Sequence, residues 1–200
     1  VKGAAVQADY TTTAREALSK MNFDLLRNKI GKIVLPHVRE RLMKLVGDTP
    51  LHYIDDAKMR QIYGDGPNAN FIYGAFVTRP DGRAEIFVNT KNPSEIMTTV
   101  LHEAMHRAVR DELRNNPLLV DQVKDMMEVL RADLKVMGLD QAHPDFRNAL
   151  KNEHEFMSEA FSNPRVQERL AMIEAPPWMV RNMRLDRSRG TLWDIVKMAV

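Results

Sequence analysis

The stretch that decides the fold is "AEIFVNTKNPSEIMTTVLHEAMH", residues 84–106. Its first six residues contain Ile, Phe and Val in succession, which predicts a β-strand. Asn92 then suits a helix N-cap, Pro93 the first helical position and Glu95 the acid of a capping box. The stretch therefore predicts a strand that leads through a short capped turn into a helix ending near Arg114.

A β-hairpin is expected immediately before this helix. The run "YGAFVT" and the run "AEIFVN" flank "RPDG", a strong turn signal with Pro at its second position and Gly at its fourth. We expect the hairpin at about residues 71–89, as a small antiparallel sheet next to the helix. A short strand, "LHYID", and a short helix, "DDAKMRQIYGDG", are predicted before it. Together with the helical patterns elsewhere, these elements predict a mostly helical α+β fold.

Residues 1 to about 10 are expected to form a loose arm, and a helical pattern begins at Thr12 or Thr13. Gly31 and Pro36 are expected to break or kink this first helix, and a second helix is expected to end at Gly47. We expect residues 1–48 to form an N-terminal helical arm that packs on a domain of residues 49–200, unless the whole chain is one domain.

Helices are also predicted after the central stretch. One follows "NNP" and ends at Gly138. A further helix is predicted at about residues 145–162, a short amphipathic one from Pro164, and a final one capped by Thr191. The first of these helices has one apolar face, made of Leu119, Val123, Met126, Met127, Leu130, Leu134 and Met137.

Composition excludes several kinds of protein. The 200 residues carry a net charge of only +2, so we expect no nucleic-acid partner, and binding by the basic N-terminal helices is the weaker alternative. No segment has the roughly 18 continuous apolar residues of a membrane span, and no signal peptide is visible. With no cysteine, an intracellular location is expected. The chain begins at Val1, and we expect it to be a piece of a longer polypeptide.

Two histidines on the central helix form a candidate metal site. His102 and His106 are one helical turn apart, so both imidazoles can reach one ion. Because cysteine is absent, any metal must be held by His and carboxylate groups. Zinc with three protein ligands keeps a fourth position for water. Glu103 lies about 100° round the helix from His102 and could take the proton of that water and pass it to a leaving amine.

The third ligand is expected from a later helix that contains "KNEHEFMSEAF". Glu155 and Glu159 are four residues apart and share a face. One carboxylate can bind zinc while the other orients a ligating imidazole, and the spacing leaves open which does which. His154 points about 100° away from Glu155 and is expected at the surface.

At these residues the chain resembles the thermolysin-type zinc peptidases, the gluzincins, through "HEAMH" followed by "EFMSE". The resemblance implies one Zn²⁺ per chain, held by His102, His106 and Glu155, with Glu103 as the base. It gives Glu159 the place that holds His102, where the family usually has Asp. The implied fold is a zincin-like metallopeptidase domain.

The blocks "EFMSEAFSNP" and "LWDIV" resemble the small metallopeptidase domain embedded in large polyvalent proteins of bacteriophages and prophages. This resemblance covers roughly residues 50–200. It implies a chain that is associated with the virion or delivered into a bacterial host cytoplasm. The substrate would be a protein or peptide, including other segments of a larger parent polypeptide.

Two functions are therefore expected to compete. The first is a zinc-dependent endopeptidase with a Glu-activated water, and the second is a catalytically silent zinc module of a large phage protein. Glu103 favours the first, because a structural zinc site has no need of it. The resemblance to gluzincins implies a downstream His or Tyr that stabilises the transition state. The chain has neither after His154, which favours the second function. Tyr73, Arg181 and Arg184 are the candidates for stabilising the transition state.

Overall fold

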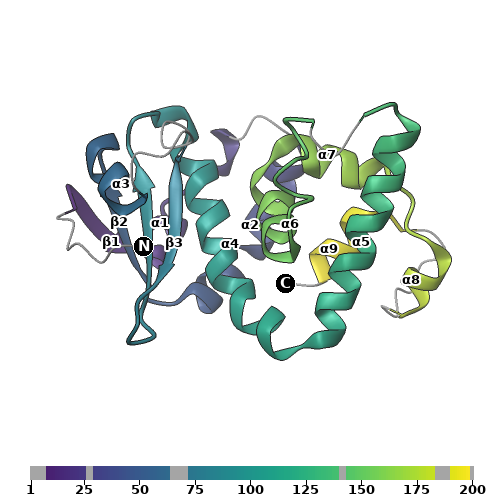
Figure 1. The fold of residues 1–200 in the computed structure, drawn as a ribbon, viewed down its shortest axis with the longest axis horizontal. Helices are drawn as coiled ribbons and strands as arrows, with labels where there is room; N and C mark the ends of the chain where they lie inside the picture. The colour runs from purple at the N-terminus through teal and green to yellow at the C-terminus, as the bar shows by residue number, and fades with distance from the viewer. Residues whose placement is uncertain (1–7, 26–28, 64–71, 140–142, 183–189, 199–200) are drawn as a thin grey trace. The chain divides into compact units, whose positions relative to one another are not determined.

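The structure is a computed structural model (Figure 1) that describes residues 8–25, 29–63, 72–139, 143–182 and 190–198. A small four-stranded sheet and many helices confirm the α+β class. Contacts group the chain into two compact units, one of residues 1–22 with 39–107 and the other of residues 23–38 with 108–200. The predicted split into an arm of residues 1–48 and a domain of residues 49–200 stays a prediction.

The first unit contains the sheet, whose strands lie in the order β1-β2-β4-β3. The predicted hairpin is confirmed: β3 and β4 pair antiparallel, and Gly82 adopts a φ of 84° in the turn, which suits glycine. The position of β3 at one edge of the sheet matters for the site described below. The four strands are β1 (Tyr10–Thr13), β2 (Pro50–Ile54), β3 (Gly74–Thr78) and β4 (Ala84–Asn89).

The antiparallel hairpin is part of a larger sheet that is mixed. β2 and β4 run parallel, with Leu51 opposite Ile86, whereas β1 pairs antiparallel with β2. Parallel neighbours need a long connection, and the helix α3 (Asp56–Tyr63) supplies part of it. The strand β1 corrects the helix start predicted at Thr12 or Thr13: these residues pair with β2, and the helix begins at Ala14.

The helix α3 packs on one face of this sheet. Asp55 caps it, since its Oδ1 accepts a hydrogen bond of 2.8 Å from the backbone N–H of Lys58. The apolar side chains of α3 and of three strands form one buried cluster, which fixes the helix on the sheet. The cluster consists of Ile54, Met59, Ile62, Ala75, Val77 and Phe87.

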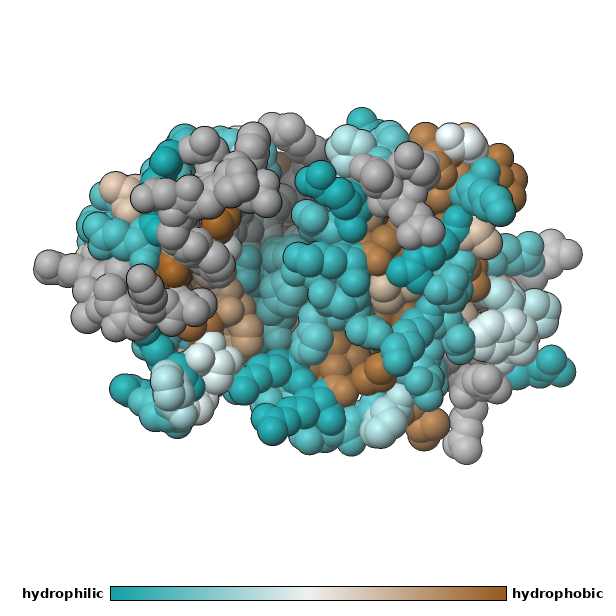
Figure 2. Space-filling view, viewed as in Figure 1, coloured by the Kyte–Doolittle hydropathy of each residue, from teal (hydrophilic) through white to brown (hydrophobic). Residues whose placement is uncertain are grey.

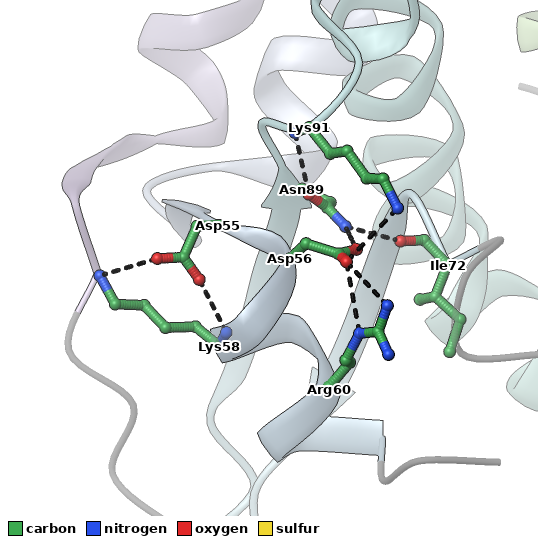
Figure 3. Close-up of polar contacts among 7 residues, drawn as sticks. All are labelled: Asp55, Asp56, Lys58, Arg60, Ile72, Asn89 and Lys91. Atoms are coloured by element: carbon green, nitrogen blue, oxygen red, sulfur yellow. Dashed lines mark hydrogen bonds and ion pairs between the residues drawn. The ribbon is translucent and has the colours of Figure 1, made fainter.

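A polar cluster joins the start of α3 to the end of β4 (Figure 3). Asn89 is only 3% exposed. Its Nδ2 donates to Asp56 Oδ1 at 3.0 Å and to the carbonyl of Ile72 at 3.2 Å. The other carboxylate oxygen of Asp56 accepts from Arg60 at 3.1 Å and from Lys91 at 3.4 Å. These bonds tie the turn after β4, which leads into the next helix, to the rest of the unit.

This cluster predicts a loss of stability in acid. The hydrogen bond from Asn89, with smaller contributions from Arg60 and Lys91, lowers the pKa of Asp56 below its ordinary value. The ionised carboxylate therefore stabilises the fold above that ordinary value, near 4, and this contribution disappears as pH falls through the lower, folded-state pKa. We expect Asp56→Asn to destabilise the protein in urea unfolding at pH 7, with a difference from wild type that shrinks in acid.

The matched control is Asp121→Asn, at an exposed position, which should change stability little at either pH. A destabilisation by Asp56→Asn that stays constant down to strongly acidic pH would contradict the role given to the carboxylate charge.

The predicted helix after β4 is present as a single 3-10 turn, η3 (Pro93–Glu95), followed by α4 (Ile96–Asn115). Asn92 has the extended backbone of an N-cap, but its side chain makes no capping hydrogen bond. Its Oδ1 instead accepts from the hydroxyl of Ser94 at 2.8 Å, so the predicted side-chain cap is wrong. The apolar residues of α4 that are buried are Val100, Leu101, Ala104, Met105, Ala108, Val109 and Leu113.

Before the sheet, α1 (Ala14–Ser19) and η1 (Phe23–Leu25) are followed by α2 (Lys29–Val46). The helix α2 runs through Gly31 and Pro36 without ending there, which corrects the predicted break. A helix-interior proline costs about 3 kcal/mol, and burial of Leu35 and Leu42 on the same helix offsets this cost. The predicted end at Gly47 is confirmed, since this residue adopts a φ of 55°.

The second unit contains the later helices. Its described helices include α5 (Pro117–Val136), α6 (Glu153–Ser162), α7 (Pro164–Met172), α8 (Pro177–Asn182) and α9 (Leu192–Met198). The apolar face predicted for α5 is buried except at Met137, which is 50% exposed because the helix ends one residue earlier. The predicted cap of α9 is confirmed by the 3.2 Å bond from the N–H of Asp194 to Thr191 Oγ1.

The helix α6 begins later than predicted. Residues 144–151 form turns, and the helix starts at Glu153 because Asn152 caps it by accepting from the N–H of Glu155 at 2.9 Å.

Figure 2 shows a surface on which hydrophilic residues predominate, with smaller hydrophobic areas between them. No helix of the described residues is long and apolar enough to cross a membrane.

Candidate metal centre

The two histidines of α4 face each other at the spacing of metal ligands. The Nε2 atoms of His102 and His106 are 3.1 Å apart, and their rings meet edge to face at 75°. Tetrahedral zinc with Zn–N distances of about 2.0–2.1 Å places two ligand nitrogens about 3.3 Å apart. The observed distance is close to that value. The same distance also suits an N–H···N hydrogen bond between the two rings, which forms when one imidazole carries its proton on Nε2.

Glu155 completes a group of three possible ligands. It lies in the first turn of α6, where Asn152 caps the helix. One ligand atom each of His102, His106 and Glu155 lies within 4.8 Å of the others, and all three side chains are half-buried. Two imidazole nitrogens and one carboxylate oxygen are a donor set that suits zinc and leaves one tetrahedral position for a non-protein ligand. The residues present therefore fit a zinc ion.

Glu103 lies next to His102 but is not one of these three residues. Its side chain is only 7% exposed, so the carboxylate is held within the protein. It packs against the first residue of β3: a Cβ placed on Gly74 would lie 2.8 Å from Glu103 Oε1. Gly74 was not among the predicted site residues. The signal for it in the sequence is a glycine at the start of an apolar strand, which indicates a close approach of backbone.

Glu159 also lies on α6 and is 7% exposed. Its Oε2 accepts a hydrogen bond of 2.7 Å from Nδ2 of Asn163, the residue that caps α7. The sequence left open whether Glu155 or Glu159 is the third ligand. Glu155 is the one whose ligand atom lies within 4.8 Å of those of the two histidines. The role of Glu159 in holding His102 stays a prediction. His154 is half-buried and is not among the three grouped residues.

Three residues were predicted as candidates for stabilising the transition state, and the structure assigns this role to none of them. Tyr73 directly precedes Gly74, and neighbouring residues of an extended chain point their side chains to opposite faces. Because Gly74 faces Glu103, this alternation argues against Tyr73. Arg181 is exposed on α8. Arg184 lies outside the described residues.

Comparison with protein-family models, with curated proteins and with solved structures finds no match for this chain. The likeness to gluzincins therefore rests on the two sequence blocks that carry it.

Proposed function

We propose that this chain is a zinc-dependent peptidase that hydrolyses peptide bonds with a water activated by Glu103. The observation that carries the proposal is the grouping of ligand atoms from His102, His106 and Glu155 within 4.8 Å. The presence of Glu103 on the same helix supports catalysis over a purely structural site, because a structural zinc site is normally closed by a fourth protein ligand.

In the proposed hydrolysis, zinc would activate the water and the carbonyl group, and residues of the chain would hold the ion and transfer the proton. Zinc held by three protein ligands lowers the pKa of a coordinated water toward 7 and polarises a carbonyl group. Glu103, buried beside the ligand pair, accepts a proton from the attacking water and returns it to the leaving amine. His102, His106 and Glu155 hold the ion in place. Burial of Glu103 strengthens its electrostatic interaction with a nearby positive charge.

The edge strand β3 provides a place for an extended substrate. The N–H of Asn89 donates to the carbonyl of Tyr73 at 2.7 Å, and the N–H of Arg79 donates to the carbonyl of Arg83 at 2.8 Å. In an antiparallel ladder these bonds alternate, so the backbone groups of Gly74 and Thr78 point away from β4. A peptide that pairs with this edge by strand addition would run past Glu103.

The second candidate is a catalytically silent zinc module that positions part of a larger phage protein. The argument in its favour is that side chains alternate along an extended chain, so Tyr73 is expected to face away from the side on which Gly74 meets Glu103. This leaves the expected electrophilic group unassigned among the described residues.

The test is peptide hydrolysis by the purified chain. We expect cleavage within a panel of unfolded proteins and mixed peptides, abolished by a chelator and restored by added zinc. The panel should include neighbouring segments of the parent polypeptide, because self-processing is one expected activity. A wild-type chain that binds zinc through four protein ligands and cleaves nothing in the panel would contradict the peptidase and support the silent module.

A further inference from the structure

A side chain at position 74 would force the side chains of Thr99 and Glu103 to shift. A Cβ built on Gly74 would lie 2.5 Å from Cγ2 of Thr99, 2.8 Å from Oε1 of Glu103 and 2.9 Å from Cγ of Glu103. Real Cβ atoms essentially never approach other atoms to less than 3.0 Å. The backbone of β3 therefore lies directly against two side chains of α4.

Space, and not backbone conformation, requires glycine here. Gly82 and Gly138 have positive φ angles of 84° and 73°, and a Cβ on either would meet nothing within 4 Å. Gly74 is not among the glycines with positive φ. Its requirement comes from the side chains that it faces.

These two side chains form one buried surface of α4. Thr99 and Glu103 are one helical turn apart, so they share a face, and they are 8% and 7% exposed. A buried carboxylate held between a helix neighbour and a strand backbone has few rotamers available. Such confinement keeps a reacting group near its productive geometry without a cost at each turnover.

We propose that Gly74 is a positioning residue for Glu103: its missing side chain leaves the space in which the carboxylate sits, and its backbone prevents the carboxylate from turning away. This inference rests on the proposed peptidase function. It predicts that a methyl group at position 74 displaces the base without touching His102, His106 or Glu155.

The experiment compares Gly74→Ala in two backgrounds. Thr99→Ser removes Cγ2, the closest of the three clashing atoms, so Gly74→Ala/Thr99→Ser isolates the clash with Glu103. Relative to Thr99→Ser alone, we expect kcat on a cleaved panel peptide to fall by about 10²-fold, the cost of a base misplaced by about 1 Å. KM and zinc content should change little. Gly82→Ala is the control: it strains the hairpin turn and lowers Tm, but kcat should remain.

A second measurement needs no activity. Gly74→Ala should lower Tm in the Thr99→Ser background, and this loss should vanish when Glu103→Ala is also present, because Cγ and the carboxylate are then gone. An equal loss of Tm with and without Glu103→Ala would overturn the inference, as would unchanged kcat in Gly74→Ala/Thr99→Ser. If the wild type cleaves nothing, the proposed function fails, and the Tm comparison still decides whether Gly74 confines Glu103.

Discussion

Glu103→Gln is expected to reduce peptide hydrolysis by about 10²–10⁴-fold, the range for loss of a positioned general base. The amide has nearly the same shape as the carboxylate but cannot take a proton from water. Because Glu103 is not among the three grouped ligands, zinc content and Tm should remain close to wild type. The measurements are initial rates on a cleaved panel peptide, elemental analysis and thermal unfolding.

The matched control is Glu112→Gln, an exposed glutamate on the same helix, which should retain full activity. If Glu103→Gln cleaves as fast as wild type, the activity belongs to another base or to a contaminant, and the mechanism is wrong. If Glu103→Gln loses zinc, then Glu103 is itself a ligand.

Glu155→Gln is expected to weaken zinc binding more than any change to a residue that only supports a ligand. Loss of a supporting residue typically costs 10–100-fold in metal affinity, so we expect Glu155→Gln to exceed about 100-fold. Glu159→Gln should stay within that lower range, because its carboxylate bonds Asn163 and lies outside the group of three. Competition with a coloured chelator measures both affinities.

Glu153→Gln is the matched control, since Glu153 is the first residue of the same helix and is not among the three. It should leave zinc affinity unchanged. The reverse order, with Glu159→Gln far more damaging than Glu155→Gln, would exchange the roles of the two carboxylates. Unchanged metal content after His102→Ala would remove the site altogether.

Local signals predicted much of the fold. The turn "RPDG" fixes the register of β3 against β4, and Asn116, which begins the segment after α4, caps α5 by accepting from the N–H of Leu119 at 3.2 Å. The spacing of His102 and His106 likewise needs only the geometry of one helix. Each of these features depends on residues that are close together in the sequence.

Features that depend on distant residues were missed or mispredicted. The parallel pairing of β2 with β4 joins residues more than thirty positions apart, and no local pattern encodes strand order. The persistence of α2 through Pro36 depends on burial of its neighbours, because tertiary packing supplies most helix stability. The demand for glycine at position 74 arises from Thr99 and Glu103 on another element.

The proposed metal centre has three protein ligands and one open position beside Glu103. Anomalous diffraction at the zinc edge, from crystals of the protein purified without added metal, tests it most directly. The account predicts one peak per chain, about 2.0–2.2 Å from a nitrogen of His102, a nitrogen of His106 and an oxygen of Glu155, with Glu103 not bound to the ion. No peak at these residues, or a fourth ligand supplied by the protein, would contradict it.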